Sequence, residues 1–129
     1  MHATHTHSRG AAKQLAYGAL AAALLALAVL EISRHGTGWW QFFAFGAGPD
    51  LALFAGIAPG LAKGQLHPRA VPLYNALHRF WGPVALGALA AFDVVSVGFF
   101  VGAVAWALHI AVDRTAGYRL RAPDGFQRS

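Results

Sequence analysis

The class of this protein is decided by the stretch Ala12–Ile32, which reads AKQLAYGALAAALLALAVLEI. Alanine and leucine fill most of it, and both are strong helix formers. Since a helix rises about 1.5 Å per residue, this run reaches across the roughly 30 Å hydrocarbon core of a bilayer. It is long and is followed by no convincing small-residue cleavage site. We therefore expect a retained transmembrane helix and not a removable signal peptide.

The composition of the whole chain has the same character. Of its 129 residues, 57% are hydrophobic and 12% are charged, whereas a soluble domain carries about 25% charged residues. In water a short chain buries a smaller fraction of its surface than a large domain does, so the apolar excess of this chain must face lipid. The net charge of +5 does not predict nucleic-acid binding, because the basic residues lie at the ends of apolar runs. The absence of cysteine excludes disulfides and thiolate metal sites.

Three further apolar segments predict three further spans within one domain. The four spans cover about residues 12–32, 39–61, 71–92 and 94–113, between a disordered tail at 1–11 and a basic cytoplasmic tail at 114–129. Only Asp93 and Ser96 interrupt the apolar run between the third and fourth spans, so one long helix is the rival interpretation.

The placement of the basic residues favours four spans. With four spans nearly all of them fall on one side, which the positive-inside rule assigns to the cytoplasm. These residues are Arg9, Lys13, Lys63, Arg69, Arg114, Arg119, Arg121 and Arg128. Only Arg34 falls on the other side, and Arg79 lies within the third span. We predict an all-α, four-helix, multi-pass transmembrane bundle with both termini cytoplasmic.

Polar residues inside three of the spans predict one cluster. An ionisable group at the bilayer centre costs about 2.5–3.5 kcal/mol on insertion scales, so it usually faces the bundle interior and has a partner. Asp50 lies in the second span, Asn75 and His78 share a face of the third, and His109 and Asp113 share a face of the fourth. The topology brings them to overlapping depths. We expect a cytoplasm-facing cluster of all five residues.

Three interpretations of the cluster remain open. The first is a divalent metal site, with zinc, manganese or iron bound by Asp50, His78, His109 and Asp113 and with Asn75 in support. An open coordination position would allow hydrolysis by an activated water. The second is a proton or ion relay. The third is a hydrogen-bond network that only holds the helices together.

Gly98 and Gly102 suggest a further functional class. They form a G-x-x-x-G motif on the same helical stripe as His109 and Asp113. Such motifs let helix backbones approach closely. An accessory subunit that forms a homo-oligomer, or packs on a membrane partner through this face, is therefore another candidate.

In the tail that begins at Arg114, basic and apolar residues alternate. Arg119 and Arg121 alternate with Tyr118 and Leu120 just inside the predicted membrane. Two placements are open for it. The segment lies on anionic lipid headgroups, or it folds back to cover the polar cluster.

Several short motifs, in their order along the chain, resemble those of a known family. They are Trp39-Trp40, Pro49-Asp50, Tyr74-Asn75 with His78 and Pro83, His109-x-x-x-Asp113-Arg114 with Gly117-Tyr118, and Gly125-Phe126. Nearly the whole chain beyond the first dozen residues resembles domain-of-unknown-function family 4260, a family of small bacterial integral membrane proteins. The resemblance implies a four-helix membrane protein and supplies no activity. Similar proteins tend to have an acidic residue where this chain has Tyr17, so the resemblance implies that one possible ligand is missing here.

Overall fold

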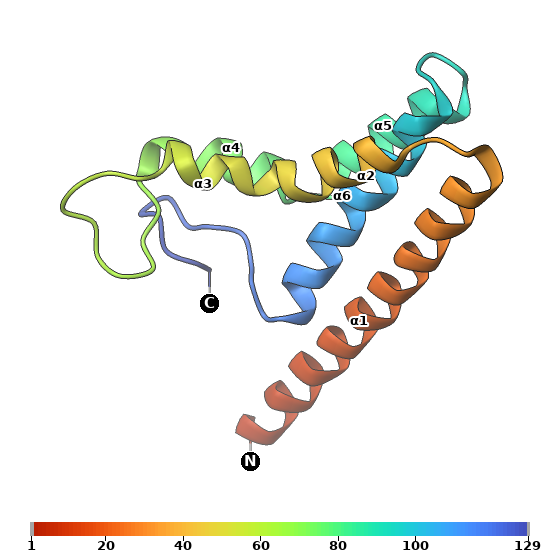
Figure 1. The fold of residues 1–129 in the computed structure, drawn as a ribbon. Coiled ribbons are helices and arrows are strands. Elements are labelled where there is room, and N and C mark those ends of the chain that lie inside the picture. The colour runs from red at the N-terminus through yellow and green to blue at the C-terminus, as the bar shows by residue number, and fades with distance from the viewer. Residues whose placement is uncertain (1, 129) are drawn as a thin grey trace.

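The structure, a computed structural model of the chain, describes the backbone of residues 2–128 and the side chains of residues 9–128. Within the described residues the chain is all-helical, as the sequence predicts. α6 (Val97–Thr115) is the central element, because α1 (His2–His35), α2 (Trp39–Ala47) and α5 (Trp81–Ala91) all pack against it. Figure 1 shows α1 and α6 running side by side, while the segments from α2 to α5 form a second layer that extends away from them.

α1 is one continuous helix that contains the whole of the predicted first span. It begins at His2, whereas we predicted a disordered tail over residues 1–11. No proline interrupts this segment, so nothing in the sequence stops the helix there. The helix is followed by Gly36 and Gly38, whose φ angles are 65° and 101°. A side chain on Gly38 would overlap α6, so glycine is required at this turn.

The second apolar segment is broken instead of forming one helix over 39–61. α2 ends at Ala47, the 3-10 turn η1 (Gly48–Leu51) follows, and α3 (Ala52–Ala55) is one short turn. Pro49 lies in the first turn of η1. Proline has no N–H to continue the α-helical hydrogen bonds, so the predicted span is divided at this point.

The third segment is broken as well. After the 3-10 turn η2 (Pro68–Ala70), α4 (Val71–Leu77) ends before His78, and α5 starts at Trp81. Pro83 lies in the first turn of α5. In a regular helix its ring would clash with the carbonyl group four residues earlier. This clash explains why α4 and α5 do not join into the predicted span of 71–92.

The third and fourth apolar runs are separate helices, which excludes the rival interpretation of one long helix. α5 ends at Ala91 and α6 starts at Val97. Between them Asp93 has a φ of 60°. Aspartate is one of the few residues that tolerates this left-handed conformation.

The G-x-x-x-G face of α6 packs within the chain. A Cβ placed on Gly98 would overlap the side chain of Gln41, and one on Gly102 would overlap Phe45, and both of those residues belong to α2. Within the chain α2 already covers this face, and its use for a homo-oligomer or a membrane partner stays a prediction.

The surface of the molecule is unusually large and apolar. The accessible area is 8134 Å², against about 6,600 Å² for a soluble monomer of this mass. Residues 9–35 and α6 are long and apolar enough to cross a membrane, and α5 is apolar but shorter. Large apolar side chains point outward from most elements, among them Leu15, Phe43, Phe54, Trp81 and Phe92. Length, composition and exposure together suggest association with a membrane.

Candidate metal centre

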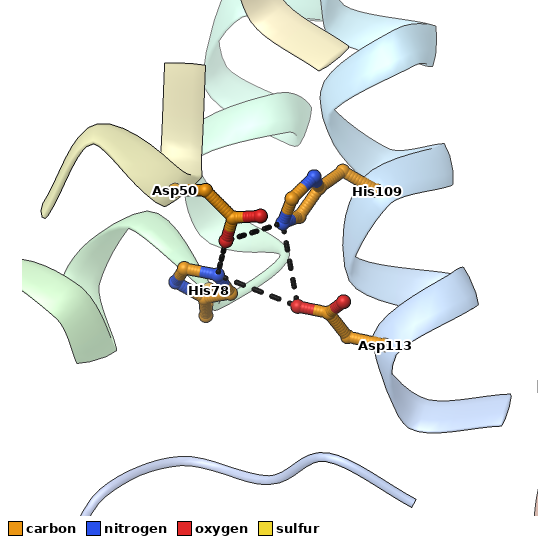
Figure 2. A group of neighbouring side chains, drawn as sticks. All are labelled: Asp50, His78, His109 and Asp113. Atoms are coloured by element: carbon orange, nitrogen blue, oxygen red, sulfur yellow. Dashed lines mark hydrogen bonds and ion pairs between the residues drawn. The ribbon is translucent and has the colours of Figure 1, made fainter. Parts of the chain in front are cut away.

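Two histidines and two aspartates from three separate segments meet at one point (Figure 2). His78 Nε2 lies 3.3 Å from Asp50 Oδ1 and 3.4 Å from Asp113 Oδ2. His109 Nε2 lies 3.1 Å from the same Asp50 oxygen and 3.3 Å from the same Asp113 oxygen. The four ligand atoms all lie within 4.8 Å of one another. The sequence prediction that these four side chains converge agrees with this arrangement.

The breaks in the second and third segments position two of the four side chains. Asp50 lies in the 3-10 turn η1, directly after Pro49. His78 is the residue that ends α4, with φ −106° and ψ 18°. His109 and Asp113 are one turn apart on α6 and share a face. One continuous helix therefore supplies half of the cluster, and two broken helices supply the rest.

Both histidine rings are oriented by backbone carbonyls. His78 Nδ1 lies 2.7 Å from the Tyr74 carbonyl oxygen, and His109 Nδ1 lies 2.7 Å from the Gly46 carbonyl oxygen. A carbonyl oxygen only accepts hydrogen bonds, so each Nδ1 carries a hydrogen and donates it. In a neutral ring the Nε2 atom then presents a lone pair, and it presents that lone pair to two carboxylate oxygens that are also acceptors. A metal ion between these atoms resolves the conflict, and so does a proton on each Nε2 atom or on a carboxylate oxygen.

The cluster is closed on the histidine side and open on the Asp50 side. The side chains of His78 and His109 are 5% and 11% exposed, and that of Asp113 is 24% exposed. The Asp50 side chain is 49% exposed. The ring of Tyr74 stacks on His78 with 4.0 Å between centroids, which further restricts the histidine. Solvent or a ligand can therefore approach the cluster past Asp50.

Asn75 does not join the cluster, which corrects the prediction. Its Oδ1 accepts a hydrogen bond from the Arg121 backbone N–H at 2.7 Å, and its Nδ2 donates to the Arg121 carbonyl at 2.9 Å. The guanidinium of Arg121 lies 5.2 Å from the centroid of the Tyr74 ring. Asn75 therefore attaches the C-terminal tail to α4.

The tail folds back against the loop that precedes α4 and against itself. The Leu66 backbone N–H donates to the Gly125 carbonyl at 2.9 Å, and Arg121 forms an isolated antiparallel bridge with Gln127. Gly125 has a φ of 95°, and a Cβ there would overlap the Leu66 carbonyl. The Gly125-Phe126 motif thus marks a close backbone approach that only glycine permits.

Neither Arg79 nor Tyr17 contacts the carboxylates of the cluster. Arg79 is exposed and forms no ion pair within the described part of the chain. Tyr17 lies outside the cluster, where its ring stacks with that of Phe80 at 6.4 Å between centroids.

Comparison with known proteins agrees with the resemblance carried by the motifs. The family model described as "Domain of unknown function (DUF4260)" matches residues 15–129. The comparison with curated proteins gave no match, and neither did the comparison with solved structures.

Proposed function

The chain belongs to the DUF4260 family, and we propose that it is a multi-pass protein of a bacterial inner membrane that binds one divalent transition-metal ion, zinc foremost. The ligands are Asp50, His78, His109 and Asp113, and the cluster faces the cytoplasm. The observation that carries the metal site is that both Nδ1 atoms are hydrogen-bonded to carbonyls while both Nε2 atoms face two carboxylates.

The distances within the cluster support a bound ion. Zinc binds imidazole nitrogen and carboxylate oxygen at about 2.0–2.2 Å, so ligand atoms at the corners of a tetrahedron lie about 3.3–3.6 Å apart. The four nitrogen–oxygen distances in the structure are 3.1–3.4 Å. Charge-assisted hydrogen bonds between nitrogen and oxygen are shorter, about 2.7–2.9 Å. The four distances are therefore close to those around a bound zinc ion, and the two that involve Asp50 are also within the range of ordinary hydrogen bonds.

The histidine orientation supports the same conclusion. Histidine ligands of metals almost always donate their other ring N–H to a carbonyl, carboxylate or water, which fixes the tautomer. The carbonyls of Gly46 and Tyr74 accept in this way here. Both belong to the last turn of a broken helix, and the Tyr74 carbonyl also accepts the His78 backbone N–H at 3.1 Å.

The membrane topology of the proposal rests on the outward apolar surface and on the basic residues. Figure 1 shows both ends of the chain on one side of the molecule and the turns after α1 and α5 on the other. The segments α1, α2–α3, α4–α5 and α6 then act as four passes. A reporter fused after residue 129 should be active in the cytoplasm, and one inserted at Gly36 should be active in the periplasm. The opposite result would refute the orientation.

Metal analysis of the purified full-length protein tests the site. We expect about one zinc, manganese or iron ion per chain, and its loss in His109→Ala and Asp113→Asn. His35→Ala is the matched control, because His35 pairs only with Glu31 at the far end of α1. Well-folded protein that stays metal-free after supplementation with all three metals would exclude the site.

A hydrolase is the second candidate, favoured by the exposure of Asp50. Closed four-ligand zinc sites are structural, whereas catalytic sites have three protein ligands and a water. If the exposed Asp50 yields its position, the remaining three ligands leave room for a water whose deprotonation the metal promotes. In cobalt-substituted protein, a hydroxamate should then change the visible absorption spectrum. A spectrum that does not respond, in the wild type and in Asp50→Ala, would exclude an accessible coordination position.

A further inference from the structure

A second polar site lies beside the cluster, between the start of α1, the end of α6 and the folded tail. It is a cavity of about 730 Å³. Four of its lining residues are cationic, namely Lys13, Arg114, Arg119 and Arg128, and none of its lining residues is acidic.

Arg114 is held in place without being neutralised. Its guanidinium carbon lies 5.6 Å from the centroid of the Tyr17 ring and 5.6 Å from that of Phe80. Its Nη2 donates to the His78 carbonyl at 3.3 Å. The neighbouring Asp113 contacts the two histidines instead. A guanidinium fixed between aromatic rings and a carbonyl remains free to bind an anion with its other N–H groups.

The four cations have no matching carboxylate among the described side chains. The ion pairs of this part of the chain involve only Arg34, His35 and the two histidines of the cluster. Like charges that converge on one cavity repel one another, and an anion between them removes that repulsion. Arginine forks match the geometry of phosphate oxygens and bind them with paired, charge-assisted hydrogen bonds.

We propose that this cavity binds a phosphate-bearing anion. Its volume falls in the range of about 300–1,000 Å³ that is typical of ligand sites, and it exceeds what a bare phosphate ion fills. The ligand is therefore a phosphate ester, either a phospholipid headgroup or a soluble organic phosphate. This site stands on its own residues and does not require the metal ion.

A second, narrow space is lined by residues of the cavity and by residues of the metal cluster. It holds about 10 Å³, and its lining includes His78 and Asp113 together with Arg114, Tyr118, Arg119 and Leu120, which also line the cavity. That volume corresponds to about one water molecule. A bound phosphate ester thus lies next to the ligand Asp113 with room for a single water between them.

Binding of glycerol 3-phosphate and of phospholipid tests the proposal. The full-length protein is placed in nanodiscs of phosphatidylcholine, and calorimetry measures its affinity for glycerol 3-phosphate. Native mass spectrometry then measures whether phosphatidylglycerol, mixed with phosphatidylcholine, is retained. Lys13→Gln and Arg114→Gln should each weaken binding about tenfold or more, since each removes a charged hydrogen-bond donor. Arg79→Gln is the matched control, because Arg79 is an exposed arginine that does not line the cavity.

The outcomes distinguish a soluble ligand from a lipid, and the anion cavity from the metal centre. Binding of glycerol 3-phosphate identifies a soluble ligand, and selective retention of phosphatidylglycerol identifies a lipid. Lys13 is exposed, so its replacement tests the site even if Arg114→Gln fails to fold. Absence of both kinds of binding, or equal loss in Arg79→Gln, would overturn the proposal. Because Lys13→Gln should retain its metal, metal content reports separately on the proposed metal centre.

Discussion

α1 and the two central segments all contain long apolar runs in the sequence but differ in structure. α1 continues without a break for 34 residues and contributes nothing to the metal cluster. The segments α2–α3 and α4–α5 break at η1 and at His78, and each supplies one ligand there. The same breaks leave the carbonyls of Gly46 and Tyr74 near the ends of helices, where they orient the two histidine rings. The comparison teaches that a broken helix can supply both a ligand and the group that orients a ligand.

Removal of the metal should have the largest effect, because it acts on the point where the broken segments meet α6. At a metal concentration about a thousandfold above the dissociation constant, bound metal stabilises the fold by about 4 kcal/mol. A strong chelator should therefore lower the melting temperature of the wild type by many degrees. His109→Ala should melt at the lower temperature with or without the chelator. If chelation shifts both proteins equally, the stabilising ion is bound elsewhere.

The contact between α2 and α6 gives the next largest effect. A Cβ on Gly102 would lie 2.7 Å from the Phe45 ring, whereas one on Gly87 in α5 would lie 3.7 Å from Ala103, an ordinary contact. Gly102→Ala should therefore lower the free energy of unfolding by about 1–3 kcal/mol. The matched variant Gly87→Ala should be neutral or slightly stabilising, since alanine favours the helix. Thermal melts of both variants measure the difference, and equal effects would contradict the close packing of α2 on α6.

The sequence predicts the cluster better than it predicts the helices that hold it. Two arguments predict that Asp50, His78, His109 and Asp113 converge: the free-energy cost of an ionisable group in the bilayer, and the depth of each residue within its span. Both arguments depend only on where a residue lies along an apolar segment. The breaks are harder to predict. Pro49 and Pro83 are visible, but apolar runs of this length give the same pattern whether the helix is continuous or divided, and membrane helices tolerate proline.

Asn75 shows the consequence of a missed break. Asn75 and His78 are three residues apart, which places them on one face only if the helix continues through both. α4 ends at Leu77, so His78 turns toward Asp50 while Asn75 points toward Arg121. The sequence carries no signal for this partner, because Arg121 lies in the tail, 46 residues further along the chain.

Restoration of a continuous helix at Pro49 should have a smaller effect, which is confined to the metal affinity of the cluster. Pro49→Ala restores an N–H that favours continuation of α2, which rotates Asp50 away from the histidines. The four ligands remain in the chain, so the metal should still bind but about tenfold more weakly, as with changes to groups that orient ligands. Competition with a chromophoric chelator measures the affinity. The control is Pro59→Ala, which changes an exposed proline in the loop after α3.

The smallest effect is expected where the tail attaches to α4. Asn75→Ala removes two hydrogen bonds to the Arg121 backbone, each contributing about 1 kcal/mol. Arg121 retains its hydrogen bonds to the Gly64 and Gly125 carbonyls, so the loss is confined to the tail. Limited proteolysis should cut the tail faster in Asn75→Ala, while the metal content should equal that of the wild type. Asn75→Asp keeps the acceptor for the Arg121 N–H and should be cut at an intermediate rate. Loss of metal in either variant would mean that Asn75 supports the cluster after all, and that the break at His78 separates the two residues less than their hydrogen bonds indicate.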